Sequence, residues 1–491
     1  MKSCLPLAFL PSALGLVAPV VRQELVELFE PEDRDTIVQD EYHVLIRDVS
    51  ELSDHWEKLG KDLSQDEACQ DYQWFKNLNS YVCTITDSAL LDEIRQDTDN
   101  VEVVAAGTIT PWKTDRETAK KRSPNELTER WGKDVSQDGP WWIQQMTASE
   151  KLTDTPDQGL CPHMEDPLPG AGVKIYVLDT GINVDHELFY SGPNEQQPHR
   201  ALHFLDFGPD DSSPFVRRKD ADKPGNNRAD FVMNDNDGHG TAVASMAASW
   251  QHGIGLRSTV VNVKVISNSV SIKHLGAGVE FRGSVINISA GGLKYHPALE
   301  GAIRAAISAG IPIFAAAENE EIDQADGTNI YPCALDSQSL IYRAGNRTLT
   351  RHSYDQVFCV SSTDREYNRA PESAYGRLIN AFAPGEGVQA AIFSANTGTG
   401  EFAGTSFAAP HAAAMASLVL GYETFERLDT PDKVYTRLEA NYLQNIVGRL
   451  PEGSDTPNNF ITTGINHPDR QDGCPYAGLT SEECAAIDDE K

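Results

Sequence analysis

Short apolar runs alternate with helical stretches between Gly172 and about Leu420. Four of the runs have turn residues beside them and the composition of strands: Val173–Leu178, Val260–Val265, Ser284–Ile288 and Ile311–Ala316. Stretches with helical composition lie between or after them, at 239–249, 272–281, 297–309 and 407–421. Because the strands of a parallel sheet are buried on both faces, this alternation predicts an α/β fold with a mostly parallel, covered sheet. In such sheets, functional residues gather just beyond the carboxyl ends of the strands.

Residues 24–112 show a second, shorter pattern. Segments typical of strands lie at Tyr42–Ile46, Tyr81–Ile85 and Val101–Ala105. Apolar residues with helical spacing occupy 50–65 and 88–97. The pattern predicts a small α+β unit in which helices pack on a sheet, and by itself it contains no candidate chemistry.

The segment 113–138 is almost entirely polar and charged, which is typical of a linker. Its basic triplet, Lys120-Lys121-Arg122, is either a cleavage site for a processing protease or a solvated run of charge. Apolar residues return at Gly139-Pro140-Trp141-Trp142, where we expect a second domain to begin and to extend to about residue 464. Residues 465–491 are polar and acidic, and we expect a tail there without an assigned function.

Composition narrows the possible partners. The chain has 491 residues, 40% of them hydrophobic, which suits one large domain and a smaller one. Its formal net charge of −32 disfavours a nucleic-acid or anionic-membrane partner, although acidity also serves solubility. Residues 1–18 resemble a secretory signal, with an early lysine, an apolar centre and small residues at the end, but Pro6 and Pro11 are unusual in one. No later stretch is apolar for long enough to span a bilayer.

Cysteine spacing suggests disulfides. Cys4 lies in the predicted signal and Cys161 has no near neighbour; in an oxidising compartment the others can form the pairs Cys69–Cys83, Cys333–Cys359 and Cys474–Cys484. Two glycosylation sequons begin at Asn346 and Asn287. The first lies in a polar insertion, whereas the second lies in an apolar strand and is expected to be inaccessible.

The stretch Glu401–Leu420 combines a turn-prone triplet, Gly404-Thr405-Ser406, with an alanine-rich run long enough for a buried helix. Ser406 is therefore predicted at or just before a helix N-terminus, where unpaired N–H groups and the helix dipole favour a developing negative charge. Pro410 is expected in the first turn of this helix, where its missing N–H costs little. The alternative is an ordinary buried helix in which Thr405 or Ser406 is only the N-cap.

Two further polar residues stand where strands or helices begin or end. Asp179 directly follows the run Val173–Leu178, although an aspartate before Gly181 can also be only a turn former. His239, between two glycines, opens a helix of small residues, although it can also be an ordinary surface histidine. Together with Ser406 they supply what nucleophilic catalysis needs: a hydroxyl, an imidazole that takes its proton, and a carboxylate that orients the imidazole.

These motifs resemble those of the subtilases, the subtilisin and proteinase K group of serine peptidases. The matching segments are Asp179-Thr180-Gly181, His239-Gly240-Thr241, and Gly404-Thr405-Ser406 followed by Ala409-Pro410-His411, in the order that subtilisin has. The similarity covers roughly residues 139–463, and Gly139-Pro140-Trp141-Trp142 resembles the mature start of proteinase K-like enzymes.

The resemblance implies a subtilisin-like three-layer fold and a role for each matched residue. Ser406 would attack the scissile carbonyl, His239 would act as general base and then acid, and Asp179 would orient His239. Asn319 aligns with the asparagine that donates to the oxyanion. The segment Ser289-Ala290-Gly291-Gly292 aligns with the strand that binds substrate in extended form and borders the P1 pocket.

The resemblance also implies a secreted zymogen. Residues 24–112 would be an inhibitory propeptide that acts on its own cleft, and 113–138 would contain the maturation site. The expected partners are protein or peptide substrates, and we expect a monomer. No cofactor is expected to be required; relatives often bind structural calcium, but no carboxylate cluster in the sequence can be assigned to it.

Two positions depart from the family pattern. Glu318 stands where a glycine usually precedes the oxyanion asparagine, so it could favour a basic P1 residue, disturb Asn319, or point toward solvent. Ala290 stands where leucine is common, which should open one wall of the cleft. Two other functions therefore remain open: a catalytically weak or inactive relative that binds peptides, and an esterase or transpeptidase on the same fold.

Overall fold

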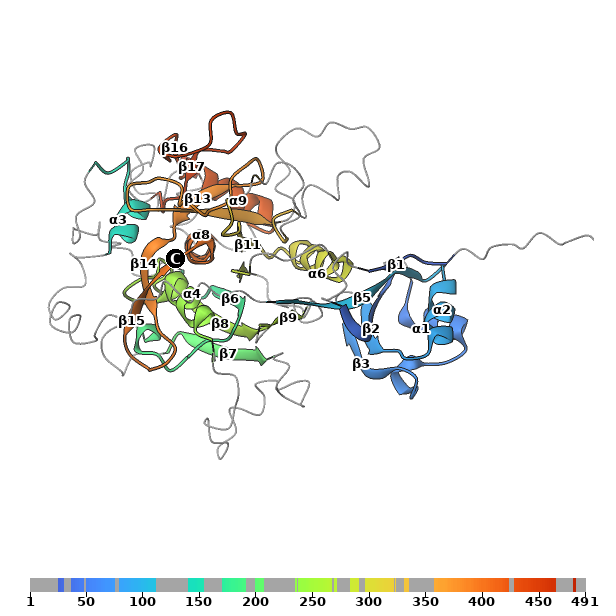
Figure 1. Cartoon of the computed structure of the whole chain (residues 1–491). Helices are drawn as coiled ribbons and strands as arrows, with labels where there is room; N and C mark the ends of the chain where they lie inside the picture. Colours follow the sequence, from blue (N-terminus) through green and yellow to red (C-terminus); the bar gives the residue numbers. More distant parts are fainter. Residues whose placement is uncertain are drawn as a thin grey trace, which may run out of the picture.

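The computed structural model describes residues 25–30, 37–47, 50–75, 79–111, 140–153, 170–190, 199–206, 235, 237–266, 269–271, 283–290, 296–321, 323, 331–334, 357–423, 428–464 and 480–482. These residues form a small N-terminal unit and a larger body, which meet at one side (Figure 1). Several predicted features lie outside the described residues: the signal, the linker with its basic triplet, most of the tail, Gly291, the Asn346 sequon, and Cys161, Cys474 and Cys484.

The N-terminal unit is a sheet with strand order β1-β5-β2-β4-β3, covered by two helices. Its elements are β1 (Leu28–Phe29), β2 (Ile37–Ile46), α1 (Leu52–Leu59), the 3-10 turn η2 (Leu63–Gln65), β3 (Gln70–Phe75), β4 (Ser80–Thr84), α2 (Ser88–Gln96) and β5 (Val101–Pro111). Local signals set the helix ends, since Asp87 caps α2 by accepting from the N–H of Ala89 and Gly60 ends α1 with φ of 69°. The three predicted strands and two helices are confirmed, whereas β1 and β3, half of whose residues are polar, were not predicted.

The larger body is built on a nine-stranded sheet with the order β16-β17-β13-β12-β11-β10-β6-β8-β7. Its strands are β6 (Lys174–Asp179), β7 (Ala201–Asp206), β8 (Thr259–Lys264), β10 (Ser284–Ile288), β11 (Ile313–Ala316), β12 (Phe358–Thr363), β13 (Ala381–Pro384), β16 (Leu443–Gln444) and β17 (Asn459–Phe460). All neighbours pair in parallel except β16 with β17. The predicted α/β class with a mostly parallel sheet is confirmed.

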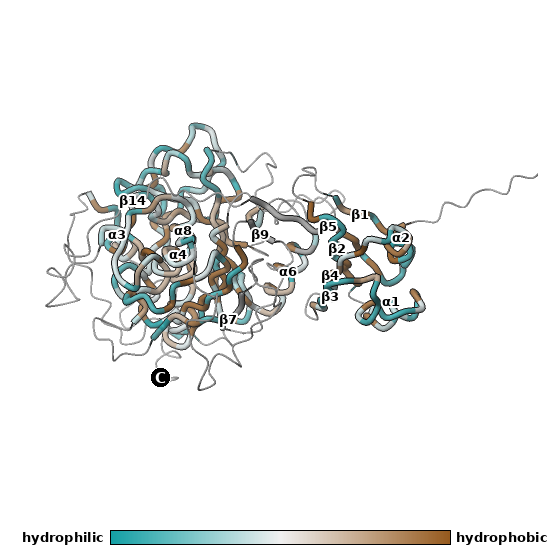
Figure 2. The backbone as a smooth tube through the Cα atoms, turned by 60° about the horizontal axis from the view of Figure 1, so that its bottom comes forward, coloured by the Kyte–Doolittle hydropathy of each residue, from teal (hydrophilic) through white to brown (hydrophobic). Residues whose placement is uncertain are grey.

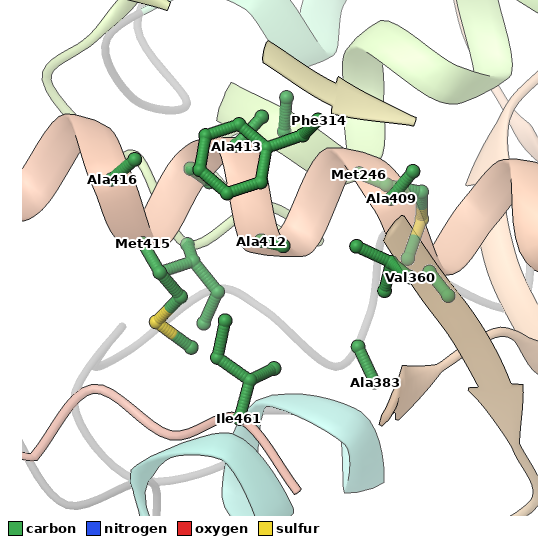
Figure 3. Packing of buried hydrophobic residues seen from close by; sticks show 14 of the residues in the cluster. Met246, Phe314, Val360, Ala383, Ala409, Ala412, Ala413, Met415, Ala416 and Ile461 are labelled. Atoms are coloured by element: carbon green, nitrogen blue, oxygen red, sulfur yellow. The ribbon is translucent and has the colours of Figure 1, made fainter. Parts of the chain in front are cut away.

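Helices cover both faces of this sheet. They are α3 (Trp141–Thr147), the 3-10 turn η6 (Glu187–Phe189), α4 (His239–Ala248), α6 (Pro297–Ser308), α8 (Thr405–Tyr422) and α9 (Pro431–Glu439); a separate hairpin joins β14 (Glu386–Ala391) to β15 (Thr399–Ala403). On one face, the alanine-rich α8 packs against β11, β12 and β13, which contribute Phe314, Val360 and Ala383 to the core (Figure 3), and α4 packs beside α8 on β6 and β8. On the other face, Leu299 and Ile303 of α6 pack against Ile286 and Ile313. Hydrophobic segments accordingly lie inside both parts of the molecule (Figure 2).

The two parts are joined by backbone pairing as well as by the chain. The end of β5 pairs antiparallel with β9 (Ser269–Ser271), with Ile109 opposite Ser271 and Pro111 opposite Ser269. At the start of α6, the buried ring of His296 places Nε2 3.0 Å from the carbonyl oxygen of Ala106 in β5. The N-terminal unit is therefore docked on the body through a strand pair and a buried side chain.

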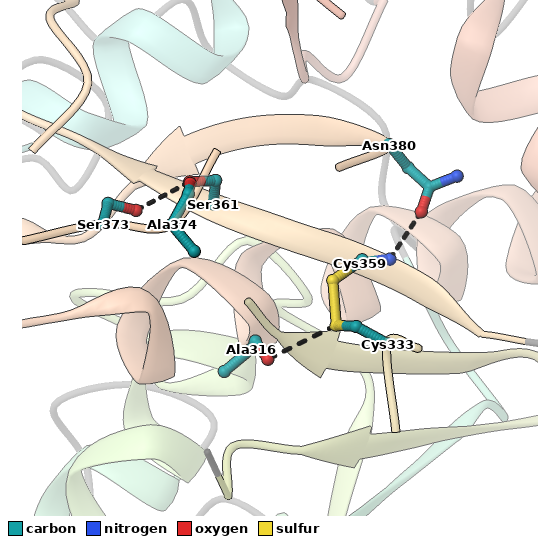
Figure 4. Close-up of a disulfide and its surroundings, with 7 residues drawn as sticks. All are labelled: Ala316, Cys333, Cys359, Ser361, Ser373, Ala374 and Asn380. Atoms are coloured by element: carbon teal, nitrogen blue, oxygen red, sulfur yellow. Dashed lines mark hydrogen bonds between the residues drawn. A yellow bond between two sulfur atoms is a disulfide. The ribbon is translucent and has the colours of Figure 1, made fainter. Parts of the chain in front are cut away.

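Two of the three predicted disulfides lie within the described residues and are confirmed. Cys69 is bonded to Cys83 in the N-terminal unit, and Cys333 is bonded to Cys359 of β12. Figure 4 shows the second bridge inside the main sheet, where Asn380 accepts from the N–H of Cys359 at 2.6 Å. Asn287 of the second sequon is fully buried in β10, so the expectation that it is inaccessible is also confirmed.

Candidate active site

Asp179, His239 and Ser406 come together at one edge of the main sheet. Asp179 is the last residue of β6, His239 is the first of α4, and Ser406 is the second of α8. In sheet order β6 has β8 on one side and β10 on the other, so connections leave it in both directions. Such a switch point opens a crevice at the carboxyl ends of the strands, which is where open α/β sheets place their sites.

The imidazole of His239 is bonded to the carboxylate of Asp179. Nδ1 of His239 lies 2.8 Å from Oδ1 of Asp179, whose carboxylate also accepts from the N–H of Thr180 at 2.7 Å. The Asp179 side chain is 1% exposed and that of His239 10%. Burial opposes protonation of His239, but the charge and hydrogen bond of Asp179, with smaller contributions from Asp237 and Asp235, raise its pKa above the ordinary value. This pair has the geometry of a carboxylate that orients a general base.

Ser406 lies next to this pair and is tied to the end of β10. Its hydroxyl donates to the carbonyl oxygen of Ser289 at 3.1 Å, and the ring of the following residue, Phe407, lies 5.7 Å from the ring of His239. The residue is 6% exposed. Hydrogen bonds of a resting catalytic serine often change partner when substrate binds, so a rotation of the hydroxyl toward the imidazole is what catalysis would require.

The expected place of Pro410 is wrong. Helix α8 begins at Thr405, so Pro410 lies in its second turn, inside the helix. A proline there removes the hydrogen bond that its N–H would give to the carbonyl of Ser406, four residues earlier. That carbonyl oxygen instead accepts from the hydroxyl of Ser289 at 2.8 Å.

Asn319 follows β11 and is held by the residue before Ser406. Its Oδ1 accepts from the N–H of Thr405 at 2.7 Å and from the Thr405 hydroxyl at 2.9 Å. A Cβ on Gly404, which has φ of 131°, would lie 3.0 Å from Asn319 Nδ2, so any other residue there would be strained and would crowd the amide. The amide oxygen of Asn319 is thus bonded to Thr405, and the role of its nitrogen as a donor to an oxyanion stays a prediction.

Glu318 adopts a conformation that explains why glycine is usual at this position. Its φ is 100°, in the left-handed region that costs a non-glycine residue about 1–2 kcal/mol. The partly buried side chain folds back and Oε1 accepts from the N–H of Asn319 at 3.0 Å. The side chain of Glu318 therefore does not point toward solvent, which was one of the three predicted alternatives. The side-chain amide of Asn319 keeps its bond to Thr405 although a glutamate precedes it.

The other predicted substrate-binding residues are placed in part. Ser289 and Ala290 directly follow β10 and are fully buried, and Ala290 packs in the core on the α6 side. Gly291 lies outside the described residues. The roles of these residues in substrate binding remain predictions.

Sequence reasoning missed a second buried carboxylate beneath the pair. Asp235 is 5% exposed and accepts five hydrogen bonds, from Thr180 Oγ1, from the N–H groups of Asp237 and Gly238, and from both N and Oγ1 of Thr241. Thr180 Oγ1 in turn accepts from the N–H of Gly240 at 2.9 Å. Burial raises the pKa of Asp235, and the hydrogen bonds oppose that shift. The turn-forming run Asn234-Asp235-Asn236-Asp237-Gly238 was the available signal.

Comparison with known proteins identifies the family of this chain. The model of the subtilase family, peptidase family S8, matches residues 170–448, more than half of the chain. The chain belongs to the subtilase family. It is similar to the subtilisin-like serine protease AsES of Sarocladium strictum, with 27% identity over 94% of this chain and 99% of that protein. It is also similar to cerevisin of Saccharomyces cerevisiae, with 27% identity over 67% of this chain and 48% of cerevisin. Among solved structures, a cold-adapted subtilisin-like serine proteinase is 25% identical with a TM-score of 0.48, covering 66% of this chain and 98% of that one.

This subtilase is a subtilisin-like serine peptidase that acts on protein substrates. Within the described ranges, no helix is both long and apolar enough to cross a membrane. No group of three or more His, Cys, Asp or Glu side chains in the same ranges could hold a metal ion, so no residue is assigned to calcium. The two disulfides indicate an oxidising compartment such as that of the secretory pathway.

Proposed function

We propose that this subtilase is a secreted, zymogen-type endopeptidase in which Ser406 is the nucleophile, His239 the general base and acid, and Asp179 the orienting carboxylate. The observation that carries the proposal is the 2.8 Å bond from His239 Nδ1 to the buried Asp179, beside Ser406 in the first turn of α8. This bond fixes the tautomer that leaves Nε2 able to take a proton.

The reaction follows from these positions. His239 Nε2 takes the proton of Ser406 as Oγ attacks the peptide carbonyl carbon, and the resulting oxyanion accepts from Asn319 Nδ2. The protonated imidazole then gives its proton to the leaving amine as the C–N bond breaks, leaving an acyl group on Ser406. Water, activated by the same imidazole, hydrolyses the acyl-enzyme.

Residues 24–112 are proposed to be the inhibitory propeptide. The support is the pairing of β5 with β9 and the bond between His296 and Ala106, which hold the last part of β5 against the body. Main-chain pairing of this kind is how a peptide adds to an exposed strand. Cleavage after β5 would separate the two units into inhibitor and mature enzyme, which would begin near Gly139.

Labelling and digestion test this proposal. We expect the matured enzyme to react stoichiometrically with a fluorophosphonate and to digest unfolded casein, and Ser406→Ala to lose both, with turnover reduced by about 10⁶ as in subtilisin. Absence of labelling would favour the inactive peptide-binding relative. Labelling without casein digestion would favour the esterase. Secretion and maturation are tested by N-terminal sequencing of the protein recovered from the medium; retention of residues 24–112 in active enzyme would contradict the zymogen.

A further inference from the structure

Helix α8 lacks one backbone hydrogen-bond donor next to the proposed nucleophile. Pro410 lies four residues after Ser406, where an ordinary residue would donate its N–H to the carbonyl of Ser406. Proline has no such N–H, and its ring also crowds the carbonyl four residues earlier. A carbonyl in so buried a place needs another donor, because leaving it unsatisfied costs about 1–3 kcal/mol.

Ser289 supplies that donor from the end of β10. Its hydroxyl, on a residue that is fully buried, donates to the carbonyl oxygen of Ser406 at 2.8 Å. The amide of Asn287 donates to the same Ser289 oxygen at 2.9 Å. Because Asn287 occupies Oγ as a donor, the proton of the Ser289 hydroxyl is directed to Ser406.

The contact between the two serines is reciprocal. The Ser406 hydroxyl donates to the main-chain carbonyl of Ser289 at 3.1 Å, while the Ser289 hydroxyl donates to the main-chain carbonyl of Ser406. Residue 406 is thus held at both its backbone and its side chain by one residue, Ser289, which directly follows β10. Removal of the bond from the Ser289 hydroxyl would leave the carbonyl of Ser406 in a helix that lacks a hydrogen bond at that point.

We propose that Ser289 is a positioning residue for Ser406, whose hydroxyl replaces the helical hydrogen bond that Pro410 removes. This inference rests on the proposed function, since it concerns the same nucleophile. It assigns to the Ser289 side chain a task distinct from any contact that its main chain makes with substrate. It also predicts that the need for the Ser289 hydroxyl depends on the presence of a proline at 410.

A double-mutant cycle tests that dependence. Ser289→Ala is expected to lower kcat about tenfold or more, because small misplacements of a reacting group are costly, while KM changes less than about threefold. Pro410→Ala restores an N–H that can donate to the Ser406 carbonyl, so the double variant should recover most of the lost kcat. All rates are expressed per site titrated with fluorophosphonate, so that loss of folded enzyme is not counted as loss of turnover.

Ser417→Ala is the matched control. Ser417 is also a buried serine of α8, but its hydroxyl donates to Ala414 and it lies away from Ser406 along the helix. Its removal should leave kcat unchanged, and Pro410→Ala should not alter its effect. A Ser289→Ala variant that raises KM without lowering kcat, or a double variant no more active than Ser289→Ala, would overturn the inference.

Unfolding in the Ser406→Ala background provides a readout that needs no activity. There Ser289→Ala should lower the unfolding midpoint, and Pro410→Ala should recover part of that loss, beyond any effect that it has alone. Additive effects would overturn the compensation even if the enzyme hydrolyses casein. If the parent does not hydrolyse casein but the coupling is present, the proposed function fails while the hydrogen-bond replacement stands. If Ser289→Ala does not fold, Ser289→Cys keeps the size with a weaker donor and is judged by the same outcomes.

Discussion

Acidification should loosen the docking of the N-terminal unit, because this contact buries a histidine. His296 is 1% exposed, and three residues of the N-terminal unit surround its ring: Ala106 at 3.0 Å from Nε2, and the rings of Phe29 and His43 at 5.7 and 5.2 Å. Burial lowers the pKa of His296 from 6.5 to about 4, against the opposing effect of the bond to Ala106. The docked form therefore prefers the neutral ring.

The sign and size follow from linkage. Because the pKa is lower when docked, the contribution to docking is fully present above pH 6.5 and is lost as the pH falls from 6.5 to about 4. Each pH unit in this window changes the free energy of docking by about 1.4 kcal/mol. At pH 5 the docking should therefore be weaker than at neutral pH by up to about 2 kcal/mol, or roughly thirtyfold in the equilibrium constant. The full amount of about 2 kcal/mol applies if the His296 ring is buried only by the docked N-terminal unit. Other titratable groups lie near this contact. They include His43 and Glu41, with Nε2 of His43 3.9 Å from Oε1 of Glu41, and Glu300 in the first turn of α6.

Hydrogen exchange on the full chain measures this effect. In the Ser406→Ala chain, which we expect not to cut itself, the amides of β9 and of the end of β5 should lose protection between pH 7.5 and 5, after correction for intrinsic exchange. The amides of β10 and β11 serve as the internal reference. His296→Gln keeps an N–H donor but does not titrate, so its pH dependence should be much smaller. Equal pH dependence in both chains, or none in the parent, would refute the reasoning.

Three further predictions concern the site. Thr180→Val removes the hydroxyl that links Asp235 to the backbone of Gly240, so kcat should fall about fivefold, whereas Thr180→Ser should keep parent kcat; equal values for the two variants would contradict this. Asp237→Asn removes a charge that raises the pKa of His239, so the acid-side midpoint of kcat/KM, expected above pH 6.5, should move down, and an unmoved midpoint would exclude that charge as a cause. Glu318→Gly removes the strain of the positive φ, but it also removes the hydrogen bond from the N–H of Asn319 to the Glu318 carboxylate. In addition, the greater backbone freedom of glycine in the unfolded chain lowers the free energy of unfolding by about 0.5–1 kcal/mol. These contributions nearly cancel, so chemical denaturation should show a change of less than about 1 kcal/mol, and a loss above about 3 kcal/mol would mean that the glutamate has a larger structural role.

The sequence was informative where apolar runs and polar motifs meet. Asp179 and His239 stand at the end of a strand and the start of a helix as predicted, because each motif directly adjoins an apolar run. Strand β12 was not predicted, since its second half is Ser361-Ser362-Thr363, a polar string that is nonetheless fully buried in the sheet. Periodicity cannot distinguish such interior hydroxyl residues from a loop.

The remaining differences depend on contacts between distant parts of the chain. Asp235 is bonded to Thr180, 55 positions away, and no local pattern indicates that the two will meet. Pro410 was predicted in a first turn because the apolar run begins after Ser406, whereas the helix starts at Thr405, which bonds to Asn319. The positive φ of Glu318 is not indicated by its residue type, because residues other than glycine rarely adopt it.

The bridge from Cys333 to Cys359 has a consequence for how this peptidase would withstand a cut in its own chain. Cys359 lies in β12, inside the central sheet. In sequence, Asn319 comes before Cys333, and Ser406 comes after Cys359. A nick anywhere between the two cysteines would divide the chain, yet the fragment with the asparagine and the fragment with the serine would remain one covalent molecule. Such a nicked enzyme would run intact on a non-reducing gel and come apart only when reduced.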